Sequence, residues 1–384
     1  MNLRKSSVRP EAALLPEMPA GEAARRILLT LMETMGANEE GALSGRDPES
    51  LHDFRVALRR TRSALGQLSR VLPKEALERF RPEFAWLGEV TGPARDLDVF
   101  LLRFDDYRQR LPEVFRKDLA PLGRLLMVRR RDEHELLAEN LGSPRYLKLK
   151  KDWADFLTAS GTPEEPHEAA GPVAELAARR IRKVLRRALR EGEGIGVASP
   201  PEELHELRKT CKKLRYLLEF FQGLYSPKKI ARLIGALKTL QDNLGDFQDC
   251  QVQSEALQQF AEGMASEGEA SPRTLMAMGM LVGDLRHRQR QARDEFADRF
   301  AEFSRKKNLR LFDELFSKSG PSSKENQMGS CLKGKSETKP REGVYRCDKC
   351  GAVSKKKGHL CKPEKLSPKD VRKIEKKALK NRGK

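Results

Sequence analysis

Apolar residues recur every three or four positions along residues 20–160 and 172–317, and alternating runs of β-branched residues are very few. Leu, Ala, Arg and Glu dominate both stretches. This period is typical of helices that bury one face, whereas a half-buried strand would alternate at every second residue. The pattern therefore predicts an all-α body.

Two of the predicted helices start at a capping residue followed by proline. Asp47 precedes Pro48, and Ser199 precedes Pro200, so that each pair would supply a side-chain acceptor and then a proline at the first helical position. Both starts lead into strongly basic segments, which read LHDFRVALRRTRSAL at 51–65 and LHELRKTCKKLRYLL at 204–218.

These two segments belong to an internal repeat. At an offset of 153 residues, His52 aligns with His205 and Asp96 with Asp249. The same offset, without a gap, pairs Leu51 with Leu204, Arg55 with Arg208, Arg59 with Lys212, Arg60 with Lys213, Arg62 with Arg215, Leu87 with Leu240, Gly92 with Gly245 and Val99 with Val252. The string AARRI also occurs twice, at 23–27 and 177–181. The sequence therefore predicts a duplicated body, each half being a multi-helix unit.

Composition sets the expected boundaries. The stretch SGTPEEPHEAAGP at 160–172 has the Gly, Pro and acidic content of an exposed connection, and beyond Ser317 the chain is too polar to offset the entropy of ordering. We expect a flexible N-terminus at 1–14 and a body at 15–317. The body would consist of a first repeat at 15–160, a linker at 161–171 and a second repeat at 172–317. After it we expect a disordered linker at 318–342, a small module at 343–363 and a basic tail at 364–384.

The basic residues of both segments lie beside the predicted buried face. At about 100° per residue, His52, Arg55, Arg59 and Arg62 share an arc roughly 80° wide next to the arc of leucines, and the second copy repeats this arrangement. One interpretation is a solvated face with carboxylate partners one helical turn away. Few such partners exist locally, because Asp53 is the only acid between Leu51 and Pro73. Clustered cations repel one another, so an anion-binding surface is the favoured interpretation.

Phosphate suits these side chains better than an isolated carboxylate. Guanidinium groups present planar donor forks that match phosphate oxygens, and lysine adds a point charge. Two stripes, each rising about 15 Å along a helix, suit a linear polyanion. Nucleic acid is one such polyanion, but apart from Tyr216 the basic segments contain almost no aromatic side chains on which bases could stack. The sequence also has no glycine-rich loop of the kind that binds nucleotide phosphates.

The net charge of +19 is unevenly distributed. Residues 1–317 hold 54 Lys and Arg against 49 Asp and Glu, whereas residues 318–384 hold 21 against 7. The tail could therefore attract almost any polyanion, and selectivity in the body must come from the local arrangement of charge.

Apolar runs are too short to span a bilayer, and the cysteines do not form a disulfide pattern. These features predict a soluble, cytoplasmic protein without a membrane partner.

Three segments resemble the motifs of the CHAD family, the conserved-histidine α-helical domain. They are HDFRVALRRTR at 52–62, GPARDLDV at 92–99 and HELRKTCKKLRY at 205–216, in the order and spacing of that family. The resemblance covers roughly residues 15–317. It implies two antiparallel four-helix bundles around a pseudo-twofold basic channel that binds inorganic polyphosphate, and an association with polyphosphate granules.

Carried over position by position, the resemblance implies a set of phosphate ligands. They are His52, Arg55, Arg59, Arg60 and Arg62 in the first half and His205, Arg208, Lys212, Lys213 and Arg215 in the second, with Arg26 and Arg180 of the repeated AARRI as additions. The second copy departs from RDLDV and reads FQDCQV at 247–252. For Asp96 and Asp98 we favour a structural role, capping a helix or orienting arginines, over contact with ligand.

The two histidines allow two interpretations. A histidine beside an apolar stripe is often a core residue, but it can also donate to phosphate and gain charge near neutral pH.

Other members of the CHAD family are fused to a triphosphate-hydrolysing domain that carries the motif ExExK. The nearest string here is EGEGI at 191–195, without the lysine. The remaining histidines have no nucleophile arrangement, so we expect binding without catalysis rather than a polyphosphate phosphatase or kinase.

The tail contains a cluster of metal-binding residue types. Cys347, Cys350, His359 and Cys361 form CxxC followed by HxC, a set that can enclose one tetrahedral zinc, and Gly351 suits the turn. The alternative is a disordered tail with free thiols. We expect a small zinc module, and a basic tail that assists attachment to granules or another polyanion. The competing hypothesis is a nucleic-acid-binding protein that acts through this tail and module.

Overall fold

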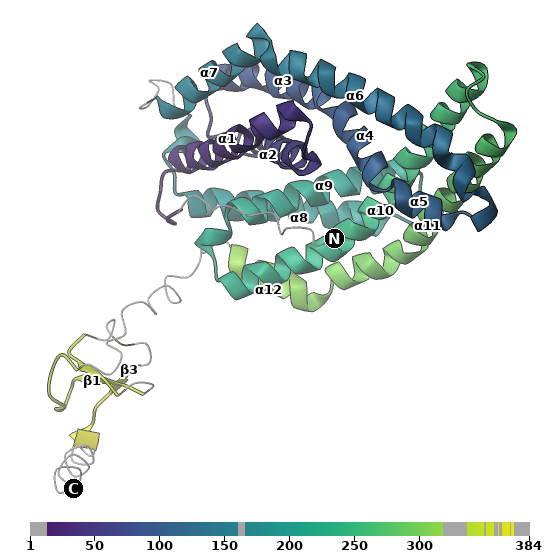
Figure 1. Cartoon of the computed structure of the whole chain (residues 1–384). Coiled ribbons are helices and arrows are strands. Elements are labelled where there is room, and N and C mark those ends of the chain that lie inside the picture. Colours follow the sequence, from purple (N-terminus) through teal and green to yellow (C-terminus); the bar gives the residue numbers. More distant parts are fainter. Residues whose placement is uncertain are drawn as a thin grey trace, which may run out of the picture. The chain divides into compact units, whose positions relative to one another are not determined.

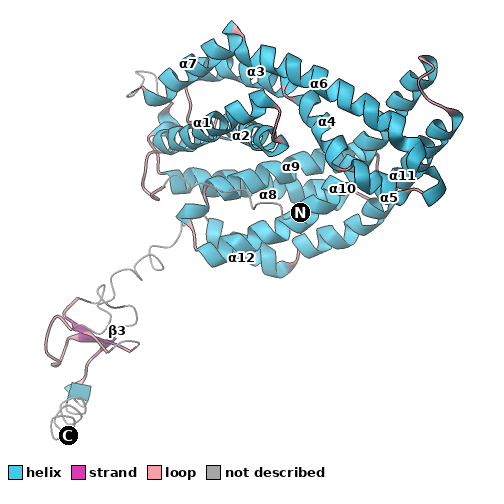
Figure 2. Ribbon diagram, in the orientation of Figure 1, coloured by secondary structure: helices cyan, strands magenta, loops and turns pink. Residues whose placement is uncertain are grey.

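The computed structural model describes residues 14–159, 166–317, 336–348, 351–356, 360, 363–368 and 370–371. The chain divides into two compact units, Met1–Lys318 and Ser319–Lys384, and we call the first the helical body. Its described residues form the predicted all-α fold (Figures 1 and 2). Residues 1–13, 160–165, 318–335 and 372–384, which include parts of the expected N-terminus, linkers and basic tail, lie outside the described residues.

The helices of the body follow one another along the chain. They are α1 (Ala20–Ser44), α2 (Pro48–Gln67), α3 (Lys74–Val90), α4 (Gly92–Leu102), α5 (Phe104–Arg110), α6 (Ala120–Gly142), α7 (Pro144–Thr158), α8 (Val173–Gly194), α9 (Pro201–Phe220), α10 (Pro227–Ser266), α11 (Pro272–Phe303) and α12 (Lys306–Phe316). Short 3-10 turns occupy Glu113–Leu119, His167–Ala169 and Gln222–Leu224. Among the described helices, none combines the length and apolarity needed to cross a membrane.

The two predicted helix starts differ in outcome. Asp47 caps α2 as expected, since its carboxylate accepts from the N–H of Glu49 at 3.0 Å. For α9 the prediction is wrong by one residue, because Pro200 is the cap and Pro201 the first helical residue. A residue before proline is excluded from helical backbone angles, so Pro200 is extended with ψ 153°.

The connection between the halves is more ordered than expected. Ala169 is buried, and the N–H of Ala20 donates to the carbonyl of Gly171 at 2.8 Å. The part of the expected linker after residue 165 therefore packs against the start of α1 through Ala169, while His167 and Ala170 are exposed as expected.

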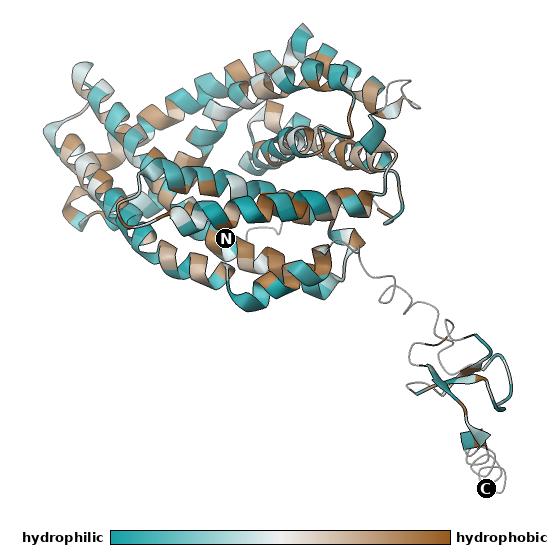
Figure 3. Cartoon of the chain, turned by 180° about the vertical axis from the view of Figure 1, so that it is seen from behind, coloured by the Kyte–Doolittle hydropathy of each residue, from teal (hydrophilic) through white to brown (hydrophobic). Residues whose placement is uncertain are grey.

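Both halves contribute to two shared cores. The larger core joins α1, α2, α3 and α7 to α8, α9 and α12, and its largest side chain, Trp153, lies edge-on to Phe80 with ring centroids 4.7 Å apart. The second core joins α4 and α6 to α10 and α11, and there Tyr107 Oη donates to Gln253 Oε1 at 2.6 Å. The helices show brown apolar bands beside teal polar ones in Figure 3, as the period predicts. The halves thus fold as one body.

A buried carboxylate ties α4 to α6. Asp98 is 1% exposed, and Oδ1 accepts from Arg130 Nε at 2.6 Å and lies 3.2 Å from His134 Nε2. Burial alone would raise the pKa of Asp98, but the hydrogen bonds from His134 and Arg130 outweigh it and lower that pKa. Arg130 also donates to the carbonyl of Gly45 at 2.8 Å, in the turn before α2. Asp98 therefore has the structural role expected of it.

The second unit contains a small antiparallel sheet. Its strands are β1 (Tyr345–Cys347), β2 (Val353–Ser354) and β3 (Pro363–Lys365), in the order β2-β1-β3. Tyr345 pairs with Ser354 on one side and with Lys365 on the other.

The Asp98 cluster yields a stability prediction. Asp98→Ala should lower the free energy of unfolding by about 3 kcal/mol, because it leaves buried His134 and the Nε atom of half-buried Arg130 without their shared acceptor. Urea denaturation followed by circular dichroism measures the change. Asp155→Asn, at an exposed position on α7, is the control and should change stability by less than about 1 kcal/mol. Equal stability of Asp98→Ala and wild type would contradict this role.

Candidate functional site

The two basic helices, α2 and α9, pack against each other near the middle of the body (Figure 1). Both bury their leucines, among them Leu51, Leu58, Leu204 and Leu214. We call the basic residues beside these leucines the first stripe and the second stripe. The first stripe consists of His52, Arg55, Arg59, Arg60 and Arg62, and the second of His205, Arg208, Lys212, Lys213 and Arg215. Arg62 is exposed, and the other nine of these residues are half-buried.

A shared carboxylate joins the two stripes. Glu219 of α9 lies 3.2 Å from Arg60 Nη2 of α2 and 2.9 Å from Arg215 Nε of its own helix. The Arg60 guanidinium also lies over the ring of Phe220, 5.6 Å from its centroid. The first stripe is therefore in direct contact with the helix that carries the second.

The stripes are close enough to repel each other. Burial, followed by the charges of Arg208 and Arg59, lowers the pKa of Lys212 to about 8. Burial and then Arg59 lower the pKa of Arg55 to about 10. The pKa of Arg208 is also lowered, by burial first and by Arg59 in addition. Because Arg59 of α2 acts on Arg208 and Lys212 of α9, the two stripes border one common region.

Arg55 and Arg208 are held at corresponding positions. Arg55 Nη1 donates to the Gly88 carbonyl at 3.1 Å and to Thr91 Oγ1 at 2.7 Å, whereas Arg208 Nη2 donates to Asp249 Oδ1 at 3.4 Å. A Cβ on Gly92 would lie 3.8 Å from Arg55, and one on Gly245 would lie 3.9 Å from Arg208. The two glycines correspond at the offset of 153 that relates the two segments, whereas the hydrogen-bond partners of the two arginines differ.

The two histidines are oriented by different partners. Arg95 Nη2 lies 3.0 Å from His52 Nδ1, and because a guanidinium only donates, this nitrogen accepts and the ring proton lies on Nε2. His205 Nδ1 lies 2.6 Å from Gln248 Oε1, an acceptor, so there the proton lies on Nδ1. Burial, followed by the charge of Arg95, lowers the pKa of His52. Both histidines are half-buried hydrogen-bonding groups and not apolar core residues.

The remaining predicted ligands differ in their surroundings. The Arg62 guanidinium lies against Gly88, where a Cβ would be 2.5 Å from Nη1. Arg180 donates to Gln67 Oε1 at 3.0 Å, near the end of α2. Arg26 is exposed and pairs with Glu22 one turn earlier at 2.6 Å, so α1 holds it by a carboxylate of its own.

Carboxylates do not match the stripes one for one. Glu219 serves two arginines, and Asp249 lies near Arg208. Arg55, Arg59, Arg62, Lys212 and Lys213 form no ion pair with any residue that the structure describes. Within the same described part, the Nε atoms of Arg55, Arg60 and Arg208 are buried and donate to no acceptor. The region has an excess of donors and positive charge, which an anion with many oxygens would balance.

Sequence reasoning missed three residues that shape this site, Thr91, Arg95 and Gln248, and it missed the contact of Glu219 with Arg60. Arg95 lies within the quoted motif GPARDLDV, and it is 43 residues from His52, as Gln248 is from His205. That shared spacing was the available signal, but a single sequence does not reveal which side chains meet across helices.

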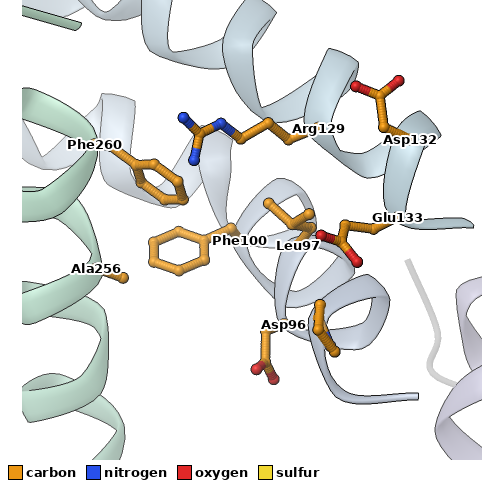
Figure 4. A pocket seen from close by; sticks show the side chains of 9 residues that line it. Asp96, Leu97, Phe100, Arg129, Asp132, Glu133, Ala256 and Phe260 are labelled. Atoms are coloured by element: carbon orange, nitrogen blue, oxygen red, sulfur yellow. The ribbon is translucent and has the colours of Figure 1, made fainter. Parts of the chain in front are cut away.

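A pocket of about 450 Å³ lies beside the first stripe, between α4, α6 and α10. Figure 4 shows the Arg129 guanidinium next to the rings of Phe100 and Phe260. Asp96, Asp132 and Glu133 also line it, and the pKa of Asp96 is raised by burial against the opposing effect of Arg55. Three carboxylates against one arginine do not suit a polyanion. This pocket therefore bounds the cationic region instead of extending it.

Of the four predicted metal ligands, the structure describes Cys347, whereas Cys350, His359 and Cys361 lie outside the described residues. Cys347 is fully buried at the end of β1. Its N–H donates to Ala352 O and its carbonyl accepts from the N–H of Gly351, both at 2.8 Å, and Gly351 has φ 75°. This tight turn needs the left-handed glycine.

Comparison with known proteins identifies the family. The CHAD domain model matches residues 26–258, and the chain belongs to this family. The uncharacterized proteins Rv2226 and MT2285 of two Mycobacterium tuberculosis strains are each 30% identical over 226 residues, which is 58% of this chain. The chain spans 42% of the length of these curated relatives.

Solved structures agree with the fold. The crystal structure of the CHAD domain from the plant Ricinus communis matches with a TM-score of 0.63 and 27% identity, over 76% of this chain and 94% of that one. PptA from Streptomyces chartreusis shares the fold with a TM-score of 0.55 and 22% identity, over 73% of this chain and 99% of that one.

Proposed function

We propose that the helical body binds inorganic polyphosphate, without catalysis, through the two stripes. The observation that carries this proposal is the cluster of half-buried arginines and lysines on α2 and α9, which border one region and outnumber their carboxylates. Membership of the CHAD family supports it, because the family is known for polyphosphate binding.

The chemistry of the cluster favours phosphate without bases. Guanidinium forks donate two hydrogen bonds to one phosphate group, and the half-buried position strengthens these bonds by reducing competition from water. The described residues near the stripes offer few aromatic faces, with Phe220 already covered by Arg60. A chain of phosphates can contact both stripes in turn, as a duplicated site with a shared channel would require.

The carboxylates nearby have other tasks. Asp96 and Asp249 lie among arginines, and Asp98 is buried against Arg130 and His134. We therefore assign the site to binding, and we propose that this binding attaches a cytoplasmic protein to polyphosphate granules. The competing nucleic-acid hypothesis assigns binding to the tail, so the two differ in which unit they require.

Charge reversal tests the stripes directly. Arg55→Glu combined with Arg208→Glu should weaken binding of long-chain polyphosphate at least about 100-fold at constant salt, since two attractive contacts become repulsive. Fluorescence anisotropy with end-labelled polyphosphate measures the affinity of the full chain and of residues 1–318. Arg124→Glu with Arg290→Glu changes net charge equally at exposed positions and should have less than about a tenfold effect. Equal losses in both double variants, or tight binding of duplex DNA by residues 1–318, would refute the proposal.

The pKa of Lys212 predicts a pH dependence. A bound polyanion stabilises the ammonium form and raises its pKa, so affinity is higher below the free-state pKa of about 8 and falls as pH rises through it. We expect the dissociation constant to increase about tenfold or more between pH 7 and pH 9.5. Lys212→Arg should flatten this profile over the same range. If the affinity of the wild-type protein stays the same across that range, Lys212 does not contact the ligand.

We also propose that the second unit holds one structural zinc through Cys347, Cys350, His359 and Cys361. The buried Cys347 and its glycine turn support a knuckle that presents two thiolates to one ion.

Metal analysis tests the zinc proposal. The full chain should contain about one zinc per molecule by plasma emission spectroscopy, and Cys347→Ser should lose most of it. Cys331→Ser, which alters a thiol outside the cluster, should retain the metal. A metal content unchanged by Cys347→Ser would rule out this residue as a ligand.

A further inference from the structure

The two stripes differ chemically at one pair of positions. Where the first half has Arg59 and Arg60, the second half has Lys212 and Lys213. An arginine keeps its charge under physiological conditions, whereas a lysine can lose its proton and then act as a nucleophile. Within the stripes, the second half alone therefore carries lysines, whose acylation gives a stable amide.

Lys212 occupies an unusual environment for a lysine. It is half-buried on α9 between Arg208, one turn before it, and Arg215, one turn after it, and Arg59 of α2 adds a third positive charge. Asp249 is the carboxylate that opposes these charges, and Lys212 forms no ion pair within the described part of the chain. Burial and repulsion lower the pKa of Lys212 to about 8, so near neutral pH the neutral amine is far more abundant than in an ordinary lysine.

The same arginines would attract an anionic reagent. The charges of Arg208, Arg59 and Arg215 act on the Lys212 amine, and guanidinium groups are donors that suit a phosphate group. A small acyl phosphate held by its phosphate would bring its acyl carbon next to the amine. Nearby Lys209 lacks these conditions, since it is exposed and pairs with Glu206.

We propose that Lys212 is an acylation site, modified by acyl phosphates without an enzyme. The neutral amine attacks the acyl carbon and forms a C–N bond, while the bond from that carbon to the bridging oxygen breaks. The oxygen leaves with the phosphate, which takes up the proton released by the amine, so that an amide and hydrogen phosphate are formed. The amide removes one positive charge from the second stripe.

This modification would regulate the proposed polyphosphate site. The consequence rests on the proposed function, because loss of charge matters only if the stripes bind a polyanion. Acylated protein should bind polyphosphate at least about fivefold more weakly, and bound polyphosphate should shield Lys212 from the reagent. The labelling reaction itself needs no polyphosphate, so it is tested separately.

The experiment compares two acetyl donors on the full chain. Acetyl phosphate and the uncharged ester N-acetoxysuccinimide are each applied at pH 7.5, and peptide mass spectrometry gives the rates at Lys212 and Lys209. We expect acetyl phosphate to favour Lys212 over Lys209 at least about tenfold, with a clearly smaller ratio for the uncharged ester. Arg59→Gln should reduce the acetyl phosphate ratio, while Lys209→Arg should leave the Lys212 rate unchanged.

The outcomes separate this inference from the proposed function. Equal rates at the two lysines, or the same ratio with both donors, would overturn the directed acylation even if polyphosphate binds. Selective labelling of a protein that does not bind polyphosphate would support the modification site and refute the proposed function. Lys212→Arg keeps the charge and cannot be acylated, so its polyphosphate affinity should not change after acetyl phosphate treatment.

Discussion

Repulsion among half-buried cations is the constraint on which the rest of this structure depends. Arg55, Arg59, Arg208 and Lys212 approach one another where α2 and α9 pack, and burial makes their charges more costly than on an open surface. A cluster of this kind destabilises the free protein, so other interactions must hold the helices together. The leucines on the adjoining faces of both helices do so, since each helix buries them in the core shared by the two halves.

The polar contacts around the cluster orient the cations without neutralising all of them. Glu219 joins Arg60 to Arg215, and Thr91 with the Gly88 carbonyl fixes Arg55 through neutral acceptors. Neutral acceptors fix a guanidinium in place but leave its charge available to an anion. The free energy that repulsion costs in the empty protein would be recovered when a polyanion binds, which links stability to occupancy.

The two halves use corresponding positions differently. Arg95 and Gln248 orient the two histidines in opposite tautomers, and the pair Arg59 and Lys212 combines a permanent charge with a titratable one. The first stripe therefore carries only arginines where the second carries lysines. The break between α3 and α4 at Thr91, where Gly92 and Pro93 follow, has no counterpart in the continuous α10. Local backbone also distinguishes the halves.

The period of apolar residues determined the all-α fold, because burial of one helical face is a local property of the chain. The repeat and the three motifs likewise identified both stripes, since residues one turn apart share a face in any helix. Contacts between helices could not be read this way. Whether Arg60 meets Glu219 and whether Arg95 meets His52 depend on how helices pack, and packing joins residues far apart in sequence. The tertiary structure alone decided which cations share one region and how strongly they repel.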